Sequence, residues 1–226
     1  MEISSAVEAI IWDLDGTLLD SFDIFQKALS DVASSFDIPM PDRSTLAANY
    51  HGSLEITIQA VLQIPDEQLL EEVIAAFLEE QGDYYDVPNE CLYKDALQLT
   101  ERIAALGLPQ FLITNRTHNG RGSASPRNII ENSVLQTVIS EIICRDDTEV
   151  HKPDPAVAWP LLEKYSLDPR SILVIGDQHV DAELARNLGC QAVIVGRNGQ
   201  SPHLETIPHW QSFATSVASL DEVALS

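Results

Sequence analysis

Short runs of apolar residues recur along the chain and alternate with longer stretches in which apolar positions fall every three or four residues. Each short run suits a strand buried on both faces of a sheet, and each periodic stretch suits a helix that buries one face. The expected strands are residues 6–12, 109–114, 138–144, 171–177 and 190–196. The expected helices are residues 95–106, 155–165 and 181–188. This alternation predicts an α/β fold with a doubly wound, Rossmann-like parallel sheet.

Residues 20–94 interrupt the alternation. They contain amphipathic helical patterns and prolines at positions 39, 41, 65 and 88, but no convincing strand. We therefore expect an inserted α-helical domain, called the cap below, at residues 20–94. The remaining residues, 1–19 and 95–226, are expected to form the core that contains the sheet.

The charge of the chain excludes several classes of partner. Its 226 residues include 35 acidic and 13 basic side chains, giving a net charge of −22. Nucleic acids and anionic membrane surfaces attract basic proteins, so neither is an expected partner. No apolar run approaches the roughly 20 residues of a membrane helix, and the first residues lack the basic region of a secretory signal. These features predict a cytoplasmic protein, either a monomer or a homodimer.

Polar residues follow the predicted strands at the points where the strands end. The carboxyl ends of parallel strands share one edge of the sheet, so these side chains are expected to lie close together. They are Asp13, Asp15, Thr114, Asn115, Arg116, Lys152, Asp177 and Asp181. Four clustered carboxylates would repel one another without a cation, and their hard oxygen atoms suit Mg²⁺. The pattern therefore predicts a magnesium site at this edge.

Four motifs occur in order along the chain: D-x-D-G-T from Asp13, T-N-R from Thr114, K-P-D-P from Lys152 and G-D-x-x-x-D from Gly176. Together they resemble the haloacid dehalogenase-like hydrolase superfamily, in its phosphatase branch with a helical cap. The resemblance covers nearly the whole chain, because the predicted cap directly follows the first motif. It implies Mg²⁺-dependent hydrolysis of a small phosphorylated metabolite through an aspartyl-phosphate intermediate.

The resemblance also implies catalytic roles. Asp13 would be the nucleophile that attacks phosphorus, and Asp15 would protonate the leaving oxygen and later deprotonate the attacking water. Thr114 would bind a phosphoryl oxygen through its hydroxyl, beside the backbone N–H of Asn115. Lys152 would neutralise charge on the nucleophile and on the phosphoryl group.

The metal would be held by the Asp13 carboxylate, the backbone carbonyl of Asp15 and the Asp177 carboxylate. Asp181 would either bind the metal, through a water molecule, or hold Lys152 in place. His179 lies near these acids, but histidine is a poor ligand for Mg²⁺ and a solvent-facing side chain is the simpler expectation.

Residues of the cap are expected to select the substrate. The cap has 15 acidic residues against three basic ones, Lys27, Arg43 and Lys94. A second strongly anionic group on the substrate would be repelled unless Lys27, Arg43 or Arg116 points inward. Gly52 lies in a loop, residues 50–55, that is similar to loops which caps of this family present to the site. The expected substrates are therefore small, with few charges beyond the phosphoryl group.

Two alternatives stay open. One is a phosphomutase similar to β-phosphoglucomutase, in which the aspartyl phosphate passes to a second sugar hydroxyl. The other is a non-catalytic member that binds Mg²⁺ or a phosphorylated protein. The carboxylate at Asp15 favours phosphoryl transfer over carbon–halogen cleavage, because a halide needs no proton to leave. The polar segment 117–128 has no assigned role.

Overall fold

The core is a twisted parallel sheet of six strands. The computed structural model describes residues 2–3, 7–50, 54–85, 88–117, 125–197, 214–217 and 224–225. The strand order is β4-β3-β2-β5-β6-β7, and every neighbouring pair is parallel. The strands are β2 (Ala9–Trp12), β3 (Gln110–Ile113), β4 (Ile139–Ile143), β5 (Ile172–Gly176), β6 (Gln191–Val195) and β7 (Ala214–Val217). A separate parallel pair, β1 (Glu2–Ile3) with β8 (Ala224–Leu225), joins the two ends of the chain.

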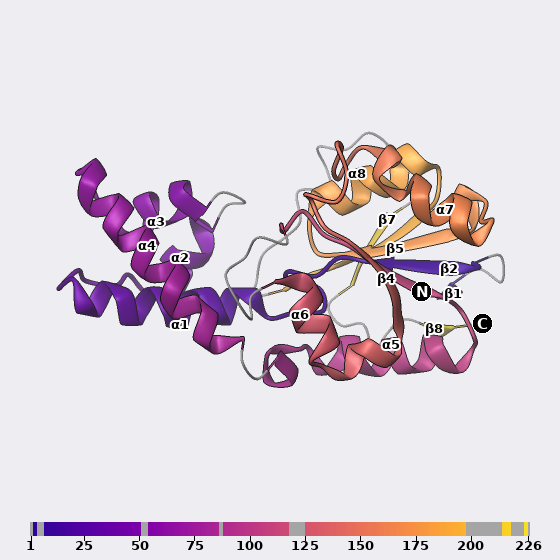
Figure 1. The fold of residues 1–226 in the computed structure, drawn as a ribbon, viewed down its shortest axis with the longest axis horizontal. Helices are drawn as coiled ribbons and strands as arrows, with labels where there is room; N and C mark the ends of the chain where they lie inside the picture. The colour runs from indigo at the N-terminus through magenta and orange to yellow at the C-terminus, as the bar shows by residue number, and fades with distance from the viewer. Residues whose placement is uncertain are drawn as a thin grey trace.

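Helices cover both faces of the sheet (Figure 1). Alternate residues of β2 enter different apolar clusters. Ile10 and Trp12 pack with the helices at 94–105 and 126–131, whereas Ala9 and Ile11 pack with the helices at 159–165 and 179–188. This follows from the two-residue period of a strand, and it explains why all four positions of β2 are apolar. The helices are α5 (Lys94–Ala105), α6 (Pro126–Glu131), α7 (Trp159–Tyr165) and α8 (His179–Leu188). Short 3₁₀ helices are η1 (Pro88–Cys91), η3 (Val134–Thr137), η4 (Pro155–Ala158) and η5 (Pro169–Ser171).

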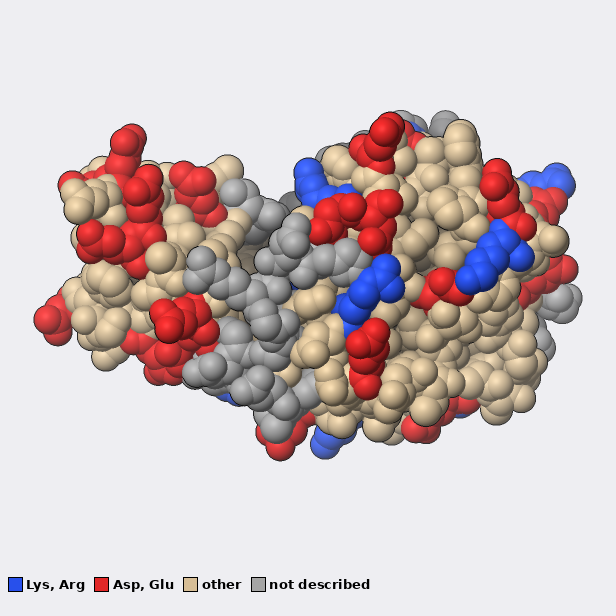
Figure 2. Space-filling model, in the orientation of Figure 1, with Lys and Arg blue, Asp and Glu red and all other residues tan. Residues whose placement is uncertain are grey.

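Four helices at one side of the molecule pack around an apolar cluster of their own (Figure 1). They are α1 (Ser21–Ser35), α2 (Arg43–Ala48), α3 (Leu54–Leu62) and α4 (Glu67–Tyr84). Phe25 and Phe77 join α1 to α4, with ring centroids 5.1 Å apart. Acidic side chains cover much of the surface of these helices in Figure 2, whereas most lysines and arginines in view lie on the core. The helical cluster falls within the predicted cap.

The chain leaves and re-enters the core along two segments that lie side by side. Asp20 donates its backbone N–H to Cys91 O at 2.7 Å, and Tyr93 donates to Leu18 O at 2.9 Å. Arg197, which follows β6 in the core, contacts the segment that re-enters the core. Its guanidinium pairs with Asp95, and the guanidinium carbon lies 3.9 Å from the centre of the Tyr93 ring. The limits of 20 and 94 for the cap stay a prediction, although the paired segments lie close to both.

The α/β fold with a doubly wound parallel sheet is confirmed. All five predicted strands are present, each within a residue or two of its predicted bounds except for the longer run at 6–12. Strand β7 and the small β1–β8 pair were not predicted. Among the helices in the described ranges, none is long and apolar enough to cross a membrane.

Candidate active site

The predicted site residues lie where the winding of the sheet reverses. From the central strand β2 the chain continues through β3 to β4 on one side, and it then crosses to β5, β6 and β7 on the other. Open α/β sheets place ligand sites at this point, at the carboxyl ends of their strands. Asp13 directly follows β2, Thr114 follows β3 and Asp177 follows β5. The fold therefore brings together residues that are far apart in the sequence.

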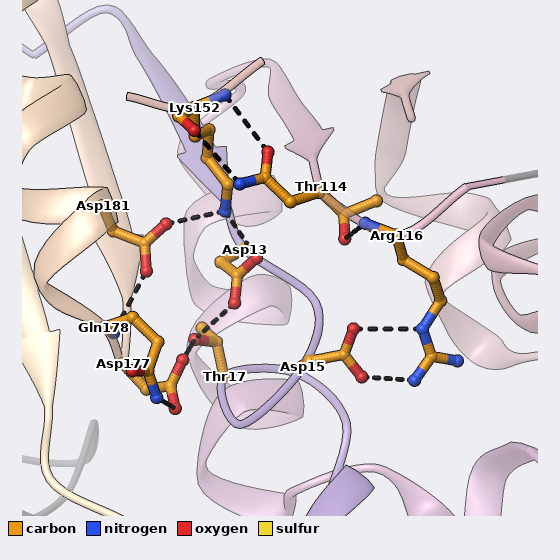
Figure 3. Close-up of polar contacts among 10 residues, drawn as sticks. Asp13, Asp15, Thr17, Thr114, Arg116, Lys152, Asp177, Gln178 and Asp181 are labelled. Atoms are coloured by element: carbon orange, nitrogen blue, oxygen red, sulfur yellow. Dashed lines mark hydrogen bonds and ion pairs between the residues drawn. The ribbon is translucent and has the colours of Figure 1, made fainter. Parts of the chain in front are cut away.

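Lys152 links two carboxylates at the centre of the site (Figure 3). Its Nζ donates to Asp13 Oδ1 at 2.6 Å and to Asp181 Oδ1 at 2.7 Å. The Lys152 side chain is 3% exposed, so it is a buried cation and not a surface lysine. Burial alone would lower the pKa of Lys152, but Asp13 and Asp181 outweigh burial and raise it. Lys152 therefore stays charged and holds both carboxylates in fixed positions.

Asp13, Asp177 and Asp181 could together hold a metal ion. One carboxylate oxygen from each lies within 4.8 Å of the others. Burial raises the pKa of Asp13, and neighbouring Asp181 raises it further against the opposing effect of Lys152. Burial and the charge of Asp13 likewise raise the pKa of Asp177. Three carboxylates share one ammonium group, so a divalent cation would balance the remaining charge with the oxygen ligands that Mg²⁺ prefers.

Asp181 has a second structural role. Its Oδ2 accepts the backbone N–H of Gln178 at 3.1 Å, which closes a capping box at the start of α8. Asp181 is thus the third residue of the helix and not its N-cap, and its other oxygen is committed to Lys152. The predicted contact with Lys152 is present. The helix itself begins at His179, which is exposed.

Thr17 stands between the two strand-end acids. Its buried hydroxyl lies 3.5 Å from Asp13 Oδ2 and 3.5 Å from Asp177 Oδ1. The turn that carries it passes through Gly16, which has a φ of +78°. A Cβ atom at Gly16 would lie 2.1 Å from Asp177 Oδ2. The glycine therefore lets the turn approach Asp177 closely.

A methyl group at Gly16 is expected to displace Asp177. Gly16→Ala and Gly107→Ala share the strain of a positive φ, roughly 1–2 kcal/mol, but a Cβ at Gly107 would meet nothing within 4 Å. Gly16→Ala should therefore lose roughly 100-fold in the activity expected of this site, the cost of a displacement of about 1 Å in an active site. Gly107→Ala should keep its activity. Equal activities of the two variants would contradict this account, and thermal unfolding checks that both fold.

Asn115 and Thr114 shape the backbone around the site. Asn115 exchanges two hydrogen bonds with the backbone of Lys152: Nδ2 donates to Lys152 O, and Oδ1 accepts from Lys152 N, both at 3.1 Å. The side chain of Asn115 is therefore occupied in positioning Lys152. The Thr114 hydroxyl is buried and accepts the backbone N–H of Arg116 at 3.1 Å.

Asp15 pairs with Arg116 on the opposite side of Asp13 from Asp177 (Figure 3). Arg116 Nε donates to Asp15 Oδ2 at 3.0 Å, and Nη2 donates to Asp15 Oδ1. Nη2 also donates to the hydroxyl of Tyr85 at 3.0 Å, and the guanidinium carbon lies 5.2 Å from the centre of the Tyr85 ring. Burial would lower the pKa of Arg116, but Asp15 outweighs it and raises the pKa.

Of the remaining predicted residues that the structure describes, Arg43 lies on the surface of the helical insertion. Arg43 pairs with Asp23 at 2.6 Å, with both side chains more than 40% exposed. Gly52 lies outside the described residues, as does most of the segment 117–128, whose last part, from Pro126, opens α6. Tyr85, at the end of the helical insertion, was not predicted as a site residue because it belongs to no motif.

Comparison with known proteins places the chain in a family. A phosphoglycolate phosphatase from Aliivibrio fischeri is 29% identical over 218 residues, which cover 89% of this chain and 90% of the relative. A hydrolase of haloacid dehalogenase subfamily IA from Geobacter sulfurreducens has the same fold, with a TM-score of 0.73, 18% identity and 97% of each chain covered. A β-phosphoglucomutase candidate from Thermotoga maritima aligns with a TM-score of 0.74 and 19% identity, covering 96% of each chain.

The relative from Aliivibrio fischeri is a phosphatase. The prediction that this chain is an enzyme of the phosphatase branch is therefore confirmed. The two structures, at under 25% identity, support the fold alone. The model of the haloacid dehalogenase-like hydrolase family matches residues 10–195, from the first strand of the sheet to the end of β6. The chain therefore belongs to the haloacid dehalogenase-like hydrolase family.

Proposed function

We propose that the protein hydrolyses a small phosphate monoester, using Mg²⁺ and an aspartyl-phosphate intermediate on Asp13. The observation that carries the proposal is the position of the Asp13 carboxylate. It follows the central strand at the reversal of the sheet, it accepts a hydrogen bond from the buried Lys152, and it lies in the acidic cluster with Asp177 and Asp181. A carboxylate fixed by a buried cation is suited to nucleophilic attack, because its position is set before the substrate arrives.

In the first step a carboxylate oxygen of Asp13 attacks phosphorus. The new bond joins this oxygen to phosphorus, and the bond between phosphorus and the ester oxygen breaks. Asp15 gives its proton to the departing oxygen, which leaves as an alcohol. Lys152 stays charged and offsets the negative charge that gathers on the phosphoryl oxygens.

In the second step water attacks the phosphorus of the aspartyl phosphate. Asp15, now a carboxylate, takes one proton from that water, and the bond between phosphorus and the Asp13 oxygen breaks. Inorganic phosphate leaves, Asp13 is again a carboxylate and Asp15 is again protonated. The two residues thus return to their starting states after one turnover.

The residues that would hold Mg²⁺ are Asp13, Asp177 and the backbone carbonyl of Asp15. Bound there, the ion would supply positive charge that stabilises the charge on the phosphoryl group. Asp181 would contribute through Lys152, because its Oδ1 accepts from Nζ and its Oδ2 caps α8. This favours the second of its two predicted roles.

The experiment is an assay of phosphate release from p-nitrophenyl phosphate, with Mg²⁺ present and after chelation. We expect turnover with Mg²⁺ and its loss with the chelator. A panel of sugar phosphates, analysed for both free phosphate and isomeric sugar phosphate, tests the phosphomutase alternative. Isomeric product without free phosphate would favour the mutase. Retained Mg²⁺ binding with no turnover on any substrate would favour the non-catalytic role.

A further inference from the structure

Arg116 pairs with Asp15, the residue that protonates the leaving oxygen in the proposed mechanism. The guanidinium therefore lies on the side of the site where the leaving group departs. Within the described residues, two basic side chains form ion pairs with the carboxylates of the four motifs. Lys152 pairs with Asp13 and Asp181, and Arg116 pairs with Asp15. Lys152 is committed to Asp13 and Asp181, on the side of the nucleophile and the metal. Arg116 is thus the cation that faces Asp15, the residue which touches the leaving oxygen in the proposed mechanism.

The ion pair between Arg116 and Asp15 competes with the proposed role of Asp15, which is to give a proton to the leaving oxygen. Both oxygens of Asp15 accept from Arg116, through Nε and Nη2. In the proposed mechanism one of these oxygens carries a proton when the ester bond breaks, and a protonated oxygen is a weaker acceptor, so at least one of the two bonds weakens. The Arg116 side chain is only 20% exposed, so a donor released there is poorly compensated by water.

A carboxylate on the leaving group would take the released donors. A guanidinium binds a carboxylate through two parallel N–H donors, and lysine or a neutral side chain cannot reproduce this geometry. In a phosphate ester of a 2-hydroxy acid, the carboxylate carbon lies two bonds from the ester oxygen. When Asp15 contacts that oxygen, such a carboxylate would lie next to Asp15 and within reach of Arg116.

Building on the proposed function, we infer that Arg116 and Tyr85 form a carboxylate subsite that Asp15 occupies until a phosphorylated 2-hydroxy acid displaces it. Tyr85 supports the subsite through its hydroxyl, which accepts from Nη2 at 3.0 Å, and through its ring, which packs against the guanidinium. The acidic cap is expected to repel a second anionic group on the substrate unless a basic side chain points into the site. Arg116 is such a side chain, because it points inward and pairs with Asp15. The preferred substrates then carry one carboxylate in addition to the phosphoryl group.

The test compares two substrates that differ only at this group. Phosphoglycolate and 2-hydroxyethyl phosphate share a two-carbon frame, which ends in a carboxylate in the first and in a hydroxymethyl group in the second. The wild-type protein should have a higher kcat/KM on phosphoglycolate than on 2-hydroxyethyl phosphate. Arg116→Gln should lower the ratio of the two kcat/KM values roughly 100-fold, as expected for the loss of charge-assisted hydrogen bonds. Tyr85→Phe should lower the ratio less.

Arg127→Gln is the matched control, because Arg127 also pairs with an aspartate, Asp147, but its side chain is 45% exposed on the core surface. It should leave the ratio unchanged. Equal losses on both substrates in Arg116→Gln would show that Arg116 only positions Asp15 and would overturn the inference. A wild-type preference for the hydroxymethyl ester would also overturn it.

A binding measurement separates this inference from the proposed function. Calorimetric titration with glycolate requires no turnover, and Arg116→Gln should bind glycolate roughly 100-fold more weakly than wild type does. Equal binding by the two proteins, or no binding by wild type, would overturn the subsite. Binding lost in Arg116→Gln, together with no hydrolysis by wild type, would leave the subsite standing and reject the phosphatase proposal.

Discussion

Asp13→Asn is expected to abolish the hydrolysis of p-nitrophenyl phosphate, with a loss in kcat of at least about 1,000-fold. An amide has nearly the shape of the carboxylate, but it is a poor nucleophile and carries no charge. The asparagine oxygen can still accept from Lys152, which donates to Asp13 Oδ1 at 2.6 Å in the wild type. The fold should therefore persist while the reaction stops.

Asp168→Asn is the matched control for this variant. Asp168 precedes β5, at the opposite end of the strand from Asp177, and it is exposed. This variant should keep wild-type kcat. Full activity in Asp13→Asn would contradict the assignment of the nucleophile, and circular dichroism of both variants excludes unfolding as the cause of any loss.

Lys152→Met is expected to lower the free energy of unfolding by about 3 kcal/mol and to abolish activity. Removing one partner of a buried ion pair leaves an uncompensated charge, which typically costs 3–5 kcal/mol. Here the variant removes the ammonium group that contacts both Asp13 and Asp181. The methionine keeps most of the side-chain volume, so lost packing contributes little. Urea unfolding without metal measures the change.

Lys164→Met provides the comparison, because Lys164 forms an ion pair with Glu141 on the surface, where its side chain is 59% exposed. Exposed pairs contribute little to stability, so this variant should unfold close to wild type. Addition of Mg²⁺ should recover part of the stability lost in Lys152→Met, because the ion supplies positive charge to the same carboxylates. Equal stabilities of the two lysine variants would contradict the central position given to Lys152.

Much of the fold could be predicted because the sheet is covered on both faces. Each central strand is then a continuous apolar run, as in Ile172–Gly176, and such runs stand out from the periodic helices. Strand β7 gives no such signal, since Ala214–Val217 reads A-T-S-V and is polar at two of its four positions. The start of α8 was predicted two residues late, because the capping acid Asp181 lies inside the helix and not before it.

Asp13 and Asp177 could be predicted as site residues because each directly follows a strand, and parallel strands end at a common edge. Asp15 and Asp181 could be predicted because they lie two and four residues further along the chain. The pairing of Arg116 with Asp15 could not, since 101 residues separate them and no spacing rule connects the two motifs. Tyr85 reaches the site from the end of the helical insertion, whose packing on the core is a tertiary property. Thr17 has the sequence context of a turn, and its contact with Asp177 depends on the close approach at Gly16.

The most direct test of the central claim is to trap the intermediate. Wild-type protein is mixed with Mg²⁺ and a hydrolysable phosphate ester and quenched in acid within one turnover, and its peptides are examined by mass spectrometry. The account predicts a phosphate adduct on Asp13 that disappears as free phosphate forms. An adduct on another residue, or phosphate release through single turnovers without any adduct, would contradict it.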